Sequence, residues 1–248
     1  MRKRLPMVLQ GAIDLIVPAS CWICETPVAD RPTAFCESCE RKLTADPHDV
    51  CPRCASTLSP FIAQIGHCPH CRKQAFAFDR VIRLGPYGEM LREAILRMKH
   101  PFGEAFADSL ASLAAPVLRD KLQGQRVDGV IPIPLHWWKR WRRGYNQSEI
   151  SARAIASALK QPLLTRVLFR TKWTEQQTAV QDRRQNVRGC FTAGREGEMR
   201  RLAGRTVLLV DDVLTSGATA DEAARVLQTF GAKMIVAVLA RASPREPL

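Results

Sequence analysis

Apolar and polar residues follow two periods along most of the chain, and the order of these periods predicts an α/β fold. Short apolar runs typical of buried strands cover residues 79–84, 129–133, 163–169, 206–210 and 233–239. Apolar residues also recur every three or four positions, as in helices with one buried face, over residues 87–100, 102–122, 147–160 and 218–230. Strands that alternate with helices predict a mostly parallel sheet covered by helices on both faces.

The first twenty residues combine a basic start with an apolar stretch and so imitate a secretory or lipoprotein signal. Gln10 and Asp14 interrupt the apolar stretch, and Pro18 stands where a cleavage site requires a small or aliphatic residue. The apolar positions follow helical spacing instead. We therefore expect an amphipathic helix over residues 1–20 that packs on a core, no membrane span, and a cytoplasmic protein.

Cysteine is concentrated in one segment of the chain. Eight of the nine cysteines lie between residues 21 and 71, where long apolar periods are scarce. A chain of 248 residues is long enough for one large core and one smaller unit. We expect a small cysteine domain at residues 21–75, after the N-terminal helix at 1–20, and an α/β domain at residues 76–248.

The eight cysteines form four pairs in which two residues separate the members, namely Cys21/Cys24, Cys36/Cys39, Cys51/Cys54 and Cys68/Cys71. Zinc takes four thiolates in a tetrahedron, so four pairs predict two structural zinc sites. Separations of 11 and 13 residues within the first two and last two pairs favour sequential pairing, although a cross-brace of first with third pair stays open. Disulfides would be reduced in the cytoplasm, a redox dithiol needs only one pair, and iron–sulfur ligation is a minor alternative.

The charge of the chain favours anionic partners. Lysine and arginine exceed aspartate and glutamate by 37 − 24 = 13, and two zinc sites with four thiolates each would lower the net charge to about +9. Such a balance is typical of proteins that bind nucleic acid, phosphorylated metabolites or an anionic membrane surface.

The most specific motif consists of a strand, two acids and a turn of small residues. The apolar run 207–210 ends in Asp211 and Asp212. The turn that follows opens the helix 218–230 and consists of Thr215, Ser216, Gly217, Ala218 and Thr219. Free backbone N–H groups at a helix N-terminus and nearby hydroxyls bind phosphate, and open α/β sheets place ligands at the carboxyl ends of strands. A plain turn with a helix cap would need only one of these side chains.

This series of four aliphatic residues, two acids, two aliphatic residues and T-S-G-A-T resembles the signature of type I phosphoribosyltransferases. The resemblance implies that residues 215–219 hold the 5-phosphate of phosphoribosyl diphosphate. It also implies that Asp211 and Asp212 contact the ribose hydroxyls, and that magnesium accompanies the diphosphate.

A second segment, after the strand 129–133, is rich in tryptophan and in basic residues. It contains Trp137, Trp138, Lys139, Arg140, Trp141, Arg142 and Arg143. In phosphoribosyltransferases the corresponding loop receives the diphosphate. Rings interleaved with cations also suit single-stranded nucleic acid, because rings stack on bases and guanidinium groups meet phosphates. The alternative is a solvated basic loop whose tryptophans pack inward.

A third segment, residues 172–189, lacks apolar periodicity and is too long for an ordinary connection, which is typical of a lid or a disordered linker. In type I enzymes such a loop closes over the diphosphate and excludes water. Arg183, Arg184 and Arg188 are the candidates for that role.

Together, the cysteine pairs and the segments P-L-H-W…R-R-G-Y-N-Q-S-E, Q-T-x5-R…N-V-x-G-x-F and V-D-D-V-x-T-S-G-A-T resemble the competence protein ComF family over nearly the whole chain. The resemblance implies a parallel-sheet, type I phosphoribosyltransferase-like α/β domain with a small N-terminal double zinc ribbon. It further implies a role in DNA uptake and natural transformation, with single-stranded DNA and proteins of the uptake machinery as partners.

Two function classes remain open from the sequence. The first is a binding module that uses phosphoribosyl diphosphate and single-stranded DNA. The second is an active phosphoribosyltransferase of nucleotide metabolism, for which neither an acceptor pocket nor a general base is identifiable. A regulator of duplex DNA is disfavoured because the chain has no helix-turn-helix pattern.

Overall fold

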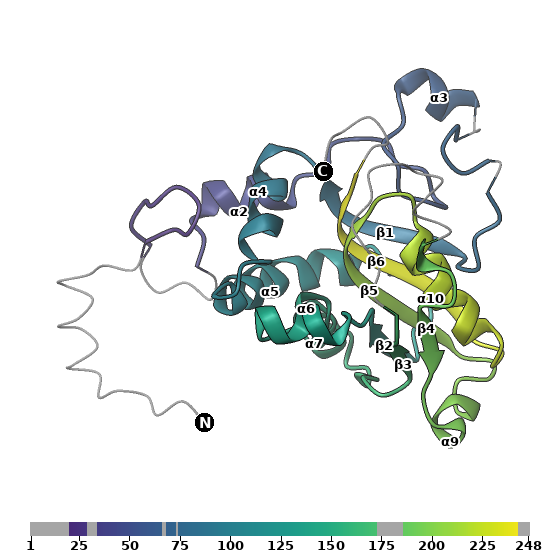
Figure 1. The fold of residues 1–248 in the computed structure, drawn as a ribbon. Coiled ribbons are helices and arrows are strands. Elements are labelled where there is room, and N and C mark those ends of the chain that lie inside the picture. The colour runs from purple at the N-terminus through teal and green to yellow at the C-terminus, as the bar shows by residue number, and fades with distance from the viewer. Residues whose placement is uncertain (1–19, 29–33, 66–67, 73, 173–185, 243–248) are drawn as a thin grey trace.

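Four parallel strands form the central sheet, in the order β1-β6-β5-β2 (Figure 1). The computed structural model describes residues 20–28, 34–65, 68–72, 74–172 and 186–242. The strands are β1 (Arg80–Pro86), β2 (Gly129–Pro132), β5 (Thr206–Leu214) and β6 (Lys233–Arg241). The prediction of a parallel α/β sheet is confirmed.

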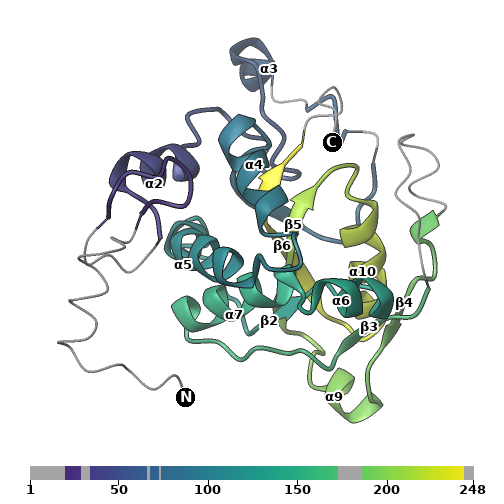
Figure 2. The same cartoon turned by 60° about the vertical axis from the view of Figure 1, so that its left-hand side comes forward.

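Helices cover both faces of this sheet, and Figure 2 shows α5 and α7 on one side of β5 and β6 with α10 on the other. Its main helices are α4 (Glu89–Arg97), α5 (Glu104–Asp120), α7 (Gln147–Leu159) and α10 (Ala218–Gln228), each within a few residues of the predicted limits. Further elements are α2 (Glu37–Thr44), α3 (Pro60–Ile65), α6 (Trp137–Arg143), α9 (Glu196–Arg200), β3 (Leu168–Arg170) and β4 (Phe191–Ala193). Among the described residues, no helix combines the length and apolar content needed to cross a membrane.

Successive residues of β5 enter two different hydrophobic cores. Leu208 and Val210 pack with α4, α5 and α7, whereas Val207 and Leu209 pack with α10. Side chains alternate between the faces of a strand, so a strand covered on both faces is apolar at every position. This explains why the run 207–210 contains no polar residue.

Two predicted strands differ from those observed. Residues 163–169 were expected to form a strand of the sheet, but only Leu163 bridges to Val130. The exposed Thr165 and Arg166 interrupt the run, and the chain then enters the separate antiparallel pair β3-β4. Conversely, β5 does not end before the two acids but continues to Leu214, because its carboxyl end still pairs with β6.

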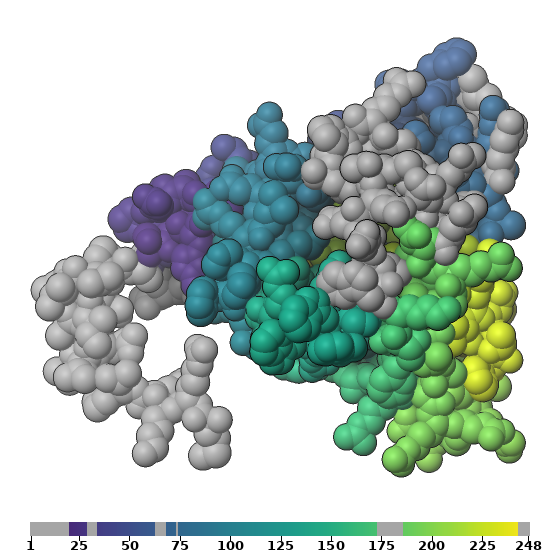
Figure 3. Space-filling model, viewed as in Figure 1, coloured from purple at the N-terminus to yellow at the C-terminus, as the bar shows by residue number. Residues whose placement is uncertain are grey.

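The cysteine segment packs directly on the α/β core. Cys21 and Cys39 belong to the same core cluster as α5. The Trp22 ring stacks on Phe106 of α5 with centroids 5.7 Å apart, and Phe35 meets the same ring edge-on at 5.5 Å. Figure 3 shows this purple segment against the teal surface of α4 and α5. The limits 1–20, 21–75 and 76–248 stay predictions, and residues 1–19 lie outside the described part of the chain.

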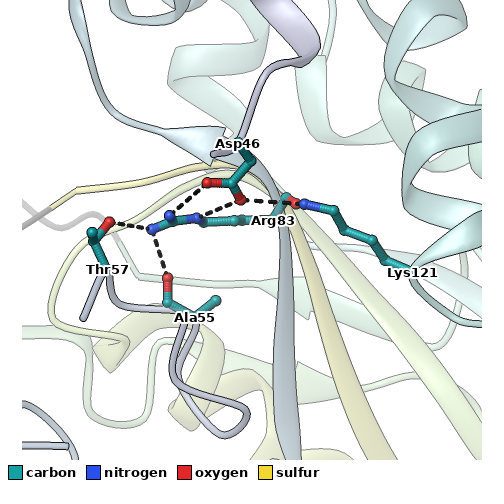
Figure 4. Close-up of polar contacts among 5 residues, drawn as sticks. All are labelled: Asp46, Ala55, Thr57, Arg83 and Lys121. Atoms are coloured by element: carbon teal, nitrogen blue, oxygen red, sulfur yellow. Dashed lines mark hydrogen bonds and ion pairs between the residues drawn. The ribbon is translucent and has the colours of Figure 1, made fainter. Parts of the chain in front are cut away.

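A buried arginine on β1 joins the cysteine segment to the sheet (Figure 4). The Arg83 guanidinium contacts the two carboxylate oxygens of Asp46 at 2.8 and 3.1 Å, the Ala55 carbonyl at 2.8 Å and the Thr57 hydroxyl at 2.9 Å. Lys121 Nζ adds a contact of 3.2 Å to Asp46. Burial acts to raise the pKa of Asp46, but Arg83 and Lys121 outweigh it and hold that pKa low. Removing either partner of such an ion pair leaves the other as a buried charge without a partner of opposite sign.

Candidate functional site

An open cavity of about 470 Å³ lies at the carboxyl ends of β2 and β5. Both acids and most of the turn of small residues line this cavity, namely Asp211, Asp212, Thr215, Ser216, Ala218 and Thr219. Parallel strands of an open α/β sheet place ligands at this end because helix N-termini and strand ends meet there. The structure therefore brings the predicted acids and the predicted turn together.

The two acids have different partners. Asp212 Oδ2 lies 2.9 Å from the ammonium of Lys99 and accepts a hydrogen bond of 3.0 Å from the Gln147 amide. Asp211 Oδ1 accepts hydrogen bonds of 3.0 Å from the Ser148 hydroxyl and 2.9 Å from the backbone N–H of Asp212. Among the described residues, a cation directly contacts Asp212 and none directly contacts Asp211.

This difference separates the protonation of the two carboxyls. Burial and the neighbouring charge of Asp212 raise the pKa of Asp211 to about 7. Burial acts in the same direction on Asp212, but the Lys99 ammonium and the Gln147 amide outweigh it and lower the pKa of Asp212. Near neutral pH, Asp212 is thus ionised, while Asp211 is present in both its protonated and its ionised form.

The turn of residues 215–219, called the phosphate turn below, starts helix α10. Gly217 is the N-cap residue and has φ 81°, a conformation that favours glycine. A Cβ at this position would lie 3.1 Å from the ring of Phe76. Thr215, Ser216 and Thr219 line the cavity at the first turn of α10, where the Ser216 hydroxyl accepts the Ala218 N–H at 3.4 Å. This arrangement suits a phosphate group.

Within the described part of the chain, five cationic side chains line the same cavity, namely Arg92, Lys99, Lys139, Arg143 and Arg170. Burial, with Arg170 and Arg143 nearby, lowers the pKa of Lys139. Of the four cations predicted for the diphosphate, Lys139 and Arg143 line the cavity, whereas Arg140 and Arg142 do not; Arg140 lies 3.4 Å from Glu149. The cavity combines an excess of cations with two acids, as a phosphorylated sugar requires.

Sequence reasoning missed Arg92, Lys99 and Arg170, together with Gln147 and Ser148. The first three belong to segments without a recognisable motif, and only folding brings them to the cavity. Gln147 and Ser148 lie in the R-R-G-Y-N-Q-S-E segment, and their place in this motif was the only feature of the sequence that could have indicated a role at the site. Gln147 donates to Asp212 and Ser148 donates to Asp211, so both side chains lie beside the two acids of β5.

The basic tryptophan segment is a helix rather than a loop. The side chain of His136 caps α6 by accepting from the Trp138 N–H at 3.3 Å, and Gly144 ends it with φ 87°. Trp137 and Trp141 are 66% and 71% exposed, and Trp138 is 40% exposed. The alternative in which these tryptophans pack inward is therefore wrong.

These rings form a surface of their own, called the tryptophan surface below. Trp138 and Trp141 stack with centroids 5.2 Å apart, and Trp137 meets Trp138 edge-on at 5.8 Å. Solvent-exposed rings that already stack on each other offer further faces for flat ligands. Lys139 and Arg143 of the same helix line the neighbouring cavity.

The eight paired cysteines gather in two tetrads. The first tetrad contains Cys21, Cys24, Cys36 and Cys39, and the second contains Cys51, Cys54, Cys68 and Cys71, with all sulfurs of a tetrad within 4.8 Å of one another. Nearest sulfurs lie 3.5 to 3.7 Å apart, close to the ~3.8 Å edge of a tetrahedron with zinc–sulfur bonds of about 2.3 Å. Sequential pairing is confirmed, the cross-brace is wrong, and the donor set fits zinc.

Both tetrads begin with the same tight turn. Glu25 and Ala55, each directly after the second cysteine of a pair, have φ 62° and 53°. The hydroxyls of Thr26 and Ser56 then lie 3.2 and 3.3 Å from the preceding cysteine sulfur. A hydroxyl at this distance can donate to the sulfur once the cysteine is a thiolate, so both turns suit a metal ligand.

The predicted lid falls mostly outside the described part of the chain, which omits residues 173–185 and with them Arg183 and Arg184. Arg188 is described and is exposed, away from the lining of the cavity. Asn186 and Val187 line the cavity directly. The lid stays a prediction.

Comparison with known proteins covers both parts of the chain. Residues 147–247 match the phosphoribosyl transferase domain family, and residues 12–73 match the double zinc ribbon domain family. Competence protein F of Haemophilus influenzae is 31% identical over 206 residues, which span 81% of this chain and 87% of that protein. DNA utilization protein YhgH of Escherichia coli O157:H7 is 28% identical over 229 residues, which span 89% of this chain and 96% of that protein.

Proposed function

Because this chain belongs to the ComF family of competence proteins, we propose that it binds phosphoribosyl diphosphate in the cavity beside β5 and single-stranded DNA on helix α6 during DNA uptake. One observation carries the first part of this proposal. Asp211, Asp212 and the phosphate turn line one cavity together with five cations.

The chemistry of the lining supports one orientation of the ligand. The 5-phosphate accepts hydrogen bonds from the phosphate turn at the start of α10. The ribose hydroxyls donate to Asp211 and Asp212. The diphosphate meets Lys139, Arg143 and Arg170. Carboxylate and diphosphate oxygens are the ligands that Mg²⁺ prefers, so magnesium fits between the acids and the diphosphate.

A calorimetric titration with phosphoribosyl diphosphate and magnesium tests this site. The wild type should bind, and the double variant Asp211→Asn/Asp212→Asn should bind at least about ten-fold more weakly, because two charged acceptors are lost. Asp120→Asn is the matched control, since this exposed acid pairs with Arg119 away from the cavity. Equal affinity of wild type and double variant would rule out the site.

The tryptophan surface supports the second part of the proposal. Single-stranded DNA stacks its bases on aromatic rings and places its phosphates near cations. Arg140 and Arg142 are exposed on the same short helix as the three rings. Helix α6 therefore presents rings for bases and guanidinium groups for phosphates on one short element.

Fluorescence anisotropy of a labelled oligonucleotide tests this surface. Trp138→Ala/Trp141→Ala should weaken binding by about ten-fold or more, since stacking contributes roughly 1–3 kcal/mol per base. Phe102→Ala is the control, because Phe102 is 91% exposed but lies between α4 and α5. The affinity of the wild type should also fall steeply with salt; affinity indifferent to salt contradicts binding led by phosphate contacts.

One observation favours phosphoribosyl transfer as an alternative function. The pKa of Asp211, about 7, lies in the range of a general base that works near neutral pH. Labelled phosphoribosyl diphosphate incubated with nucleobases and amines distinguishes the two functions. Release of diphosphate that depends on an acceptor and on Asp211 supports transfer, and binding without release supports the binding module.

A further inference from the structure

Arg241, the last residue of β6, lies between the second tetrad and the phosphate turn. Its Nε donates to the carbonyl of Cys54 at 3.1 Å, and its Nη1 donates to the carbonyl of Leu214 at 3.0 Å. Nη1 also donates to the carbonyls of Thr215 and Ala242. One side chain therefore holds a metal-ligating cysteine and the first residue of the phosphate turn at the same time.

A second connection joins the same two parts. Phe76, five residues after the last cysteine of the second tetrad, packs against that tetrad. The Phe76 ring also covers Gly217 of the phosphate turn. The N–H of Ala77 donates to Asp221, in the first turn of α10, at 2.7 Å. The second tetrad thus supports the turn from two directions.

The surroundings of Arg241 also leave a charge to be balanced. Arg241 is 6% exposed, and its guanidinium is always protonated. All the hydrogen bonds given above go to neutral carbonyls, and within the described residues no carboxylate forms an ion pair with it. Four thiolates outweigh the charge of a divalent ion, so the filled second tetrad is anionic and lies beside this cation.

From these contacts we infer that Arg241 is a positioning residue through which a zinc ion in the second tetrad strengthens phosphate binding at the turn of residues 215–219. This inference rests on the proposed function of that turn. The first tetrad has no such connection among the described contacts, because it packs on α5 through Trp22 and Phe35. Metal in the two tetrads therefore has different consequences for the ligand.

Ribose 5-phosphate is the probe for the test, since it carries the phosphate and the ribose hydroxyls without diphosphate. The matched variants are Arg241→Lys and Arg83→Lys. Both arginines hold the chain near Cys54, but Arg83 contacts Asp46, Ala55 and Thr57 and not the phosphate turn. Lysine keeps the positive charge of either residue. Its single ammonium group replaces the planar guanidinium, so it cannot donate hydrogen bonds to two separate parts of the chain at once.

We expect Arg241→Lys to weaken ribose 5-phosphate binding about ten-fold in calorimetry, and Arg83→Lys by less than about two-fold, although both lower the thermal midpoint. Cys68→Ser, which removes a ligand of the second tetrad, should also weaken binding about ten-fold, and Cys24→Ser in the first tetrad less than about two-fold. The double variant Cys68→Ser/Arg241→Lys should bind no more weakly than either single variant, because both interrupt one connection. Zinc content of each protein is measured by atomic absorption.

Each outcome decides the question. If the wild type binds and Arg241→Lys binds equally well, the coupling is overturned while the proposed function stands. If the wild type binds neither ribose 5-phosphate nor phosphoribosyl diphosphate, both are overturned. Should Arg241→Lys fail to fold, Cys68→Ser and Cys24→Ser decide, and equal affinities of these two proteins overturn the coupling.

Discussion

Two adjacent aspartates of β5 differ in protonation because a single lysine contacts only one of them. Lys99 lies 2.9 Å from Asp212, whereas the nearest partners of Asp211 are a hydroxyl and a backbone N–H. A buried carboxyl without a cation keeps its proton to higher pH, and one beside a cation loses it early. At the scale of single residues, the two acids therefore give the cavity one fixed negative charge and one negative charge that depends on pH.

Asp211→Asn tests the pH-dependent charge. The pKa of Asp211 is raised to about 7 in the folded protein, above the value of about 4 in an unfolded chain. Between these values the folded state binds more protons, so ionisation of Asp211 lowers stability as pH rises. The unfolding free energy of the variant relative to wild type should increase by about 2–3 kcal/mol from pH 5 to pH 8. Urea titrations at both pH values measure it, and an Asp120→Asn control should show no such increase.

Lys99→Met tests the fixed charge. The carboxylate of Asp212 is 10% exposed, and without Lys99 it loses its cation. We expect a loss of about 1–3 kcal/mol in unfolding free energy at pH 7. The pKa of Asp212 is lowered in the folded protein, so this stabilisation is present above the unfolded pKa and disappears as the pH falls through the folded one. A loss that is equal at pH 7 and pH 3, or equal to that of the exposed Lys233→Met, would contradict the role of the pair.

The sequence identified the acids and the phosphate turn because these residues are neighbours in the chain. The order of these residues was enough to predict a phosphate-binding site, and the fold places them in one cavity. Lys99, Arg170 and Arg241 could not be identified in the same way, because each reaches its partners only through tertiary packing. The chain contains 37 lysines and arginines, so an isolated basic residue gives no indication in the sequence that it belongs to the site.

At the scale of elements, helix α6 shows what periodicity cannot detect. None of its seven residues is buried, so its apolar residues, the three tryptophans, do not form the buried face from which helices are predicted. Its end signals were nevertheless present in the sequence, since Gly144 closes it in the left-handed conformation and His136 caps its start. The apolar helices α4, α5, α7 and α10 were predicted within a few residues for the opposite reason, because each buries one face.

The start of α10 allows a sharp test of the phosphate turn. Gly217→Ala should destabilise the protein by more than Gly124→Ala, because both glycines have positive φ but only Gly217 has a ring, that of Phe76, within 3.1 Å of a new Cβ. Positive φ alone costs about 1 kcal/mol for alanine, and the displaced ring adds roughly another 1 kcal/mol. Thermal and urea unfolding of the two variants measure the difference. Equal destabilisation would mean that Phe76 does not press on the turn.

At the scale of the whole molecule, the cysteine segment is not a separate appendage. Cys21, Phe35, Cys39 and Leu43 share one core cluster with α5, and Arg83 joins the segment to β1. Composition was the basis for predicting two units, since nearly all cysteines lie in one segment of the sequence. Composition carries no information about contacts between units, so the shared core could not be predicted from it.

Removal of metal should therefore affect the entire protein. We expect about two zinc ions per chain, and a strong chelator should shift the whole calorimetric unfolding transition to lower temperature instead of producing a separate transition for the cysteine segment. The expectation follows from the cysteines that lie in the main core. A chelated protein whose α/β part unfolds at the original temperature would show that the two units are energetically independent.

The strand order has a consequence for how the chain is made. The two central strands, β5 and β6, are the last two in sequence, while β1 and β2 occupy the edges. β1 pairs with β6, and β2 pairs with β5. A ribosome releases the chain from its N-terminus, so among the described strands neither β1 nor β2 has its sheet partner until residues 206–241 follow. The sheet cannot form until β5 and β6 have been synthesised, so its folding is completed only near the end of translation.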